Sequence, residues 1–129
     1  MLKKIIKVPL YPNRLGIILT DDNNINKTYD FFKNQGMSNN FVLQCAATIN
    51  GWFREEDGIS YKCIYVVLNF SDDELSHGSI THEVIHFVNH VFTDINAKTD
   101  QTNDEPQAYL AQWATNCIYS FLKESEKSI

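Results

Sequence analysis

The chain has 129 residues, of which 43% are hydrophobic and 21% charged, and this composition fits one globular domain over residues 1–129. The formal net charge is −5, which disfavours a protein that binds nucleic acid through its phosphates. No segment reaches the eighteen or so apolar residues of a membrane span, and the start MLKKIIKVPLYPNR lacks the pattern of a secretory signal. We therefore expect a cytoplasmic protein with no nucleic-acid partner and no membrane partner.

The first forty residues predict strands followed by a helix. Residues 3–20 mix short apolar runs with prolines, which is typical of one or two strands. The polar cluster 21–26 suits the start of a helix over about 25–34, which would bury Ile25, Tyr29 and Phe32 and end at Gly36.

Two runs rich in β-forming side chains follow, at 41–53 and 58–70, and Asp57-Gly58 between them suits a hairpin turn. The second run is apolar on both of its faces, which is typical of a central strand. One face carries Ile64, Val66, Leu68 and Phe70, and the other carries Tyr61, Cys63, Tyr65, Val67 and Asn69.

The remainder predicts helices. The sequence SDDE at 71–74 fits a capping box, with Ser71 as N-cap and Glu74 reaching back, and it would open a short helical turn that Gly78 ends. Ser79 would then cap a longer helix from 80 to about 95. A last helix is expected from about 105 to 123, with Pro106 in its first turn, where the missing N–H has no helical partner. Strands, a helix and a hairpin in 1–70 and helices in 71–123 define an α+β fold.

The helix over 80–95 carries HEVIH at 82–86. On a helical wheel His82, Glu83 and His86 share a narrow polar stripe, opposite a wide apolar face. Histidines four residues apart lie on one side of a helix, where two imidazole nitrogens can bind one metal ion. Glu83 is placed to accept a proton from a metal-bound water. His90 is too far along the helix to share that ion with His82, so we expect it to be a supporting or surface residue.

A catalytic zinc ion usually has three protein ligands and one open position. Eighteen residues separate His86 from Glu105, which gives the pattern HExxH-x18-E. The loop before the last helix is long enough to bring Glu105 back to the histidines. Asp104 competes with Glu105 as the third ligand, and both carboxylates could instead only cap the helix.

Over about residues 76–123 the chain resembles the gluzincin metallopeptidases, in which a glutamate at about the position of Glu105 is often the third zinc ligand. The stretches SITHEVIHFVNHVF and NDEPQAYLAQW also resemble small metallopeptidase-like proteins encoded in phage and prophage genomes. The resemblance implies a minimal zincin-like domain, with a small, mostly antiparallel sheet packed on the HExxH helix and a C-terminal helix. Tyr109 is a departure, because thermolysin-like enzymes have an aspartate there.

These features predict a zinc-dependent peptidase that acts on a peptide or protein substrate. Zn²⁺ would be held by His82, His86 and Glu105. Glu83 would take a proton from water as that water attacks a peptide carbonyl. Tyr109 is the first candidate for stabilising the oxyanion, with His77 or His90 in reserve. The alternative, that Tyr109 is an ordinary helix tyrosine, is slightly favoured. A strand edge in 41–50 or 59–70 would align the substrate.

A second class of function stays open. A zinc site can stabilise a fold or an interface, so the chain could be a non-catalytic regulator or assembly factor. A protein partner or a second copy could also complete the cleft, because the sequence holds no second domain to wall it. The three cysteines Cys45, Cys63 and Cys117 are far apart and have no CxxC spacing, so we expect free thiols.

Overall fold

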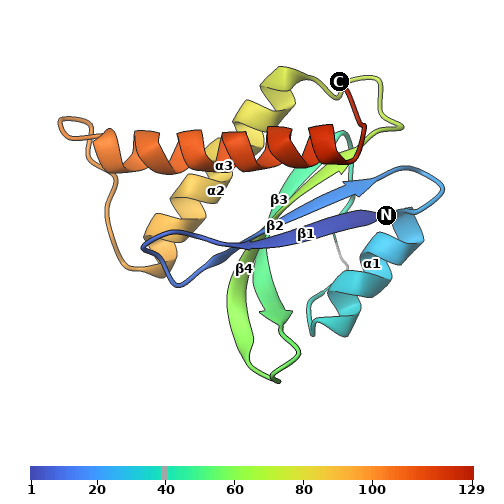
Figure 1. Ribbon diagram of the computed structural model, residues 1–129, viewed down its shortest axis with the longest axis horizontal. Helices are drawn as coiled ribbons and strands as arrows, with labels where there is room; N and C mark the ends of the chain where they lie inside the picture. Colours follow the sequence, from blue (N-terminus) through green and yellow to red (C-terminus); the bar gives the residue numbers. More distant parts are fainter. Residues whose placement is uncertain (39–40) are drawn as a thin grey trace.

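The computed structural model describes residues 1–38 and 41–129 and has the predicted α+β architecture (Figure 1). None of its helices, over these residues, combines the length and the apolar character that a bilayer crossing requires. The elements in chain order are β1 (Leu2–Lys7), β2 (Arg14–Thr20), α1 (Ile25–Asn34), β3 (Ala46–Arg54), β4 (Ser60–Asn69), α2 (His77–Asp94) and α3 (Glu105–Glu124).

The four strands form one sheet in the order β1-β2-β4-β3. Strands β1 and β2 pair antiparallel, as do β3 and β4, whereas β2 and β4 pair parallel with Arg14 opposite Cys63. Strand β4 is therefore central, as its two apolar faces predict. Strand β3 is at the edge of the sheet, so only one side of its backbone is bonded to another strand.

The sheet is covered on both faces, and each face has its own core. Helices α2 and α3 cover one face and α1 covers the other (Figure 1). The larger core joins β2 and β4 to α2 and α3 through buried side chains that include Leu15, Ile17, Ile64, Val66, Leu68, Phe87, Val91, Ala114 and Ile118. The smaller core lies under α1 and contains Ile18, Phe32, Cys63, Tyr65 and Val67.

Gly16 on β2 makes room for Tyr65 on β4. The two residues are paired in the sheet, and a Cβ atom at Gly16 would overlap the Tyr65 ring. The Tyr65 hydroxyl donates to the carbonyl oxygen of Trp52 at 2.7 Å. The ring is thereby fixed at the centre of the smaller core, where it is fully buried.

Some local expectations are confirmed and others need correction. Helix α1 has the predicted bounds, although Thr28 is buried beside Phe32 while Ile25 and Tyr29 are only half-buried. The hairpin turn has Gly58 at a φ of 83°, and the three cysteines are free. Strand β3 begins at Ala46 and not at residue 41.

The predicted capping box at 71–74 is wrong. No helix forms there, and the Ser71 hydroxyl accepts the N–H of Asp22 instead. Helix α2 begins at His77 with Ser76 as its N-cap, so Gly78 lies inside the helix that it was expected to precede. Ser76 caps a helix that packs on the core, and that packing stabilises the helix. A short turn at 71–74 would have no such packing, so the helix that begins at His77 is favoured.

Candidate metal centre

The start of α2 fixes which residues share the face that carries the histidines. The Ser76 hydroxyl oxygen accepts the N–H of Ser79 at 3.2 Å, and the Ser79 hydroxyl oxygen accepts the N–H of Ser76 at 3.1 Å. This reciprocal cap holds the first turn of the helix. Within the helix, side chains that are three or four residues apart lie next to one another on the same face.

His82 and His86 lie one turn apart on this face, with both rings exposed. Nε2 of His86 is 3.2 Å from Nε2 of His82, and the ring centroids are 4.8 Å apart. Two imidazole nitrogens that bind one tetrahedral zinc ion, each at about 2.1 Å, are themselves about 3.4 Å apart. The two nitrogens therefore already have the separation that a shared ion requires.

Glu83 completes the group of side chains that could hold a metal ion. Its carboxylate and the two histidine rings each offer a ligand atom, and these atoms lie within 4.8 Å of one another. No other group of this kind is found in residues 1–38 and 41–129. The predicted arrangement of two imidazoles and an adjacent carboxylate is thus present in the fold.

Glu83 differs from the histidines in being buried, with 7% of its surface exposed. The Thr48 hydroxyl oxygen on β3 lies 3.1 Å from Oε1 of Glu83 and 3.1 Å from its backbone oxygen. A hydroxyl has one proton, so it donates to one of these acceptors at a time. The contact holds the carboxylate against the edge strand, on the side of α2 that faces the sheet.

His90 belongs to a polar cluster beyond the histidine pair. Its Nδ1 is 3.4 Å from Nδ2 of Asn50, which also donates to Oδ1 of Asp94 at 3.3 Å. Burial lowers the pKa of His90, the Asp94 carboxylate opposes this shift, and His86 and Lys62 add to it. His90 is not part of the group that could hold a metal ion, which agrees with the expectation that it does not share an ion with His82.

The structure does not bring Glu105 into this group. Glu105 is exposed at the first residue of α3. Its neighbour Asp104 lines a groove with Ile85 and Asn89 of α2, so the start of α3 lies beside α2. The assignment of Glu105, or of Asp104, as the third ligand stays a prediction.

Tyr109 and His77 also lie apart from the histidine pair. Tyr109 is 65% exposed and lines an apolar hollow with Pro9 and Leu10. Nδ1 of His77 is 2.6 Å from the Tyr119 hydroxyl, and these two residues line a different hollow. Their predicted roles as oxyanion donors receive no support from these positions.

A polar pocket of about 450 Å³ opens beside His82 and Glu83. It lies between the start of β3, the segment before α2 and the first two turns of α2. Its lining residues are Gln44, Cys45, Ala46, Glu74, Ser76, Gly78, Ser79, His82 and Glu83. Two of the three residues that could hold a metal ion, His82 and Glu83, therefore line this pocket.

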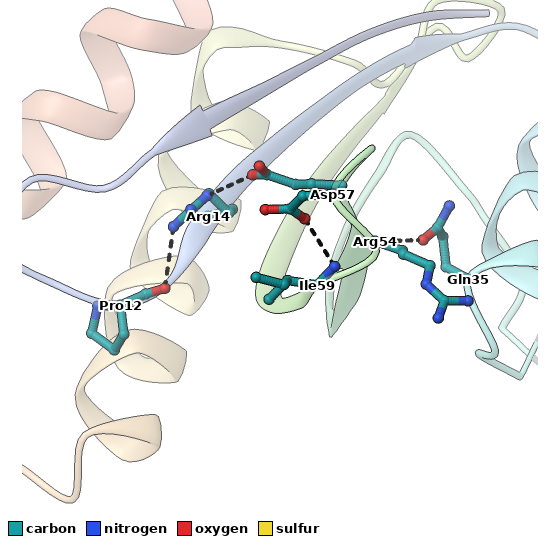
Figure 2. Close-up of polar contacts among 7 residues, drawn as sticks. Pro12, Arg14, Gln35, Arg54, Asp57 and Ile59 are labelled. Carbon is teal, nitrogen blue, oxygen red and sulfur yellow. Dashed lines mark hydrogen bonds and ion pairs between the residues drawn. The ribbon is translucent and has the colours of Figure 1, made fainter.

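A larger hollow of about 660 Å³ lies at the other end of β3. Charged residues line it, and two of them are paired: Arg14 donates to Glu55 at 3.2 Å. Arg14 also donates to the Pro12 carbonyl oxygen at 3.4 Å. Figure 2 shows Arg14 donating to Pro12, together with Asp57 accepting the N–H of Ile59 in the adjoining hairpin turn. None of these side chains belongs to the group that could hold a metal ion, so this hollow is a poor candidate for the functional site.

Sequence reasoning missed three residues at the site: Thr48, Cys45 and Glu74. Thr48 contacts Glu83, while Cys45 and Glu74 line the pocket. The threonine had a weak signal, because an alternating run predicts its side chain to share a face with Ala46 and Asn50. The contact with α2 depends on how the helix lies across the sheet, and no local pattern encodes that.

Comparison with known proteins adds no assignment: the chain matches no family model, no curated protein and no solved structure.

Proposed function

We propose that this chain is a zinc-dependent peptidase whose site is built on α2. His82 and His86 would hold the metal, with Glu105 as the proposed third ligand from the start of α3. When bound, zinc would act as a Lewis acid and bring the pKa of a bound water to about 7. The observation that carries the proposal is the 3.2 Å separation of the two Nε2 atoms beside a buried carboxylate.

Glu83 would act as the general base. When the Thr48 hydroxyl donates to Oε1 of Glu83, the other carboxylate oxygen is still free to accept a proton from the attacking water. The same carboxylate would then return the proton to the leaving amine. Because the fold already shields Glu83 from bulk water, the carboxylate needs little further desolvation for this step.

Strand β3 would align the substrate. It is the edge of the sheet next to α2, and Thr48 on this strand contacts Glu83. An extended peptide can pair with the free backbone groups of an edge strand. A peptide bound in this way would run past the pocket beside His82 and Glu83.

The decisive experiment compares the purified protein with its Glu83→Gln variant. Both should bind zinc when metal content is measured, whereas the rate of peptide hydrolysis should fall by about 10²–10⁴-fold in the variant. His82→Ala should lose the metal, and His77→Ala is a matched control on the same helix that should retain it. Equal hydrolysis by the wild type and Glu83→Gln would reject the peptidase.

A non-catalytic zinc protein is the second candidate, and the exposure of both histidine rings favours it. A metal ion there would have positions open to solvent, and a side chain of a partner could fill them as well as a substrate could. This candidate requires that zinc binds and that Glu83→Gln leaves partner binding unchanged.

A further inference from the structure

The pocket beside His82 and Glu83 has an uneven distribution of charge. Its lining contains two carboxylates, Glu74 and Glu83, and no lysine or arginine. Glu83 is buried and bonded to Thr48. Glu74 is exposed at the pocket wall, so the two acids differ in what they can contact.

The Glu74 carboxylate is unused within the part of the chain that the structure describes. It makes no hydrogen bond and no ion pair with residues 1–38 or 41–129. Its backbone, in contrast, is fixed at both ends: the N–H donates to Asp72 at 2.9 Å, and the carbonyl oxygen accepts from the Ser79 hydroxyl at 3.4 Å. Glu74 therefore lines the pocket beside the candidate metal centre from a backbone that two hydrogen bonds hold in place.

The start of α2 also borders this pocket, and a helix N-terminus favours negative charge. Here, however, Ser76 and Ser79 bond each other's N–H groups, which leaves fewer free donors for an anion. A full negative charge on Glu74 also exceeds the half charge of a helix end. A zinc ion held by His82 and His86 would add two positive charges, which Glu74 and Glu83 together would balance. A group that contacts the Glu74 carboxylate directly would then still be favoured if it is a cation.

On the basis of the proposed peptidase function, we propose that this pocket selects substrates that place a positive charge beside the scissile bond. An ammonium or guanidinium group would lie against Glu74 while the peptide bond lies at His82 and Glu83. A lysine or arginine side chain and a free amino terminus share this chemistry. An exposed ion pair of this kind would give a preference of about fivefold.

The test uses the zinc-loaded protein with two libraries of short random peptides, one with free and one with acetylated amino termini. Cleaved positions are read by mass spectrometry. The expected result is an enrichment of Lys and Arg of about fivefold at one fixed position. If the cation is instead the amino terminus, the free library should be cleaved near its start and the acetylated library should resist.

Variants at the pocket then test the role of Glu74. Glu74→Gln should abolish the preference, and Glu74→Lys should shift it toward Asp and Glu. Asp73→Asn is a matched control, because it removes the same charge from the adjacent exposed residue, which does not line the pocket. A preference that survives Glu74→Gln, or a wild type that prefers acidic or apolar residues, would overturn the proposal.

A binding measurement separates this inference from the peptidase itself. The zinc-loaded Glu83→Gln variant should bind a fluorescent lysine-containing peptide about fivefold more tightly than its norleucine counterpart, and adding Glu74→Gln should remove the difference. If the wild type cleaves no peptide but the difference in binding is observed, only the peptidase proposal is rejected. Equal binding of the two peptides would reject the cation pocket.

Discussion

The Thr48 hydroxyl on the edge strand lies 3.1 Å from Oε1 of Glu83, whose side chain is 7% exposed. In Thr48→Val the carboxylate would lose this donor and stay buried, so we expect a loss of about 1–3 kcal/mol in the free energy of unfolding. Thr48→Ser keeps the hydroxyl and should be the more stable of the two variants. Urea denaturation measures the free energy of unfolding of both variants. Equal stability of Thr48→Val and Thr48→Ser would show that the hydrogen bond to Glu83 contributes nothing.

The third ligand can be identified by metal content. If Glu105 binds zinc, Glu105→Ala should retain less than the stoichiometric amount, whereas Asp104→Ala should bind as the wild type does. The opposite result would assign the role to Asp104, whose side chain lines the groove with Asn89. Full zinc content in both variants would show that neither carboxylate is a ligand.

His90 should make stability depend on pH. Burial lowers its pKa below the ordinary 6.5, so as the pH falls below 6.5 the unfolded chain binds a proton before the folded protein does. The stability it contributes is present above pH 6.5 and is lost as the pH falls toward its folded pKa.

This prediction is measured as the difference in unfolding free energy between about pH 7.5 and about pH 5.5, with a chelator present to remove metal linkage. The difference should shrink in His90→Gln and persist in His77→Gln, since His77 is exposed at the start of α2. Identical pH profiles for the wild type and His90→Gln would contradict it.

Two glycines should respond in opposite ways to alanine. A Cβ at Gly16 would overlap the Tyr65 ring, whereas at Gly78 its nearest neighbour would be Ser76 Oγ at 3.6 Å. Gly16→Ala should therefore cost about 1–3 kcal/mol, and Gly78→Ala, inside a helix, should gain up to about 1 kcal/mol. Thermal or urea unfolding checks both, and a neutral Gly16→Ala would mean that the Tyr65 ring moves without cost.

Two of the three thiols should differ in reactivity. Cys63 is fully buried, and burial raises its pKa to about 12. Because the thiolate is the reactive form, iodoacetamide should modify Cys63 in the native protein far more slowly than Cys45, which lines the pocket. Peptide mass spectrometry resolves the sites, and both thiols should react alike in urea.

The sequence predicts correctly the positions of the two candidate site residues whose separation depends on helix α2 alone, His82 and His86. His82 and His86 meet because residues four apart on a helix always lie close together. The burial of Glu83 was not foreseen, because it depends on Thr48, which approaches from a strand far away in the sequence. A helical wheel identifies which polar residues share one face of a helix, but it does not show which other segments that face will contact.

Helix α3 shows the same limit. Its bounds are nearly those predicted, but Glu105 and Tyr109, the residues expected at the site, are exposed. The rotation of the helix about its axis is set by its apolar side, where Leu110, Ala114 and Ile118 enter the larger core. Burial of these side chains outweighs any preference of a few polar groups.

The parallel pairing of β2 with β4 constrains the order in which this protein can fold. Arg14 lies opposite Cys63, so the intervening chain must close a long loop before the central strands can meet. Contacts between distant parts of a chain slow folding. During synthesis, the histidine pair leaves the ribosome only after every strand has been made. The side chains that could hold a metal ion would then come together only after all four strands have been synthesised, so the proposed zinc ion would bind late and would not nucleate the fold.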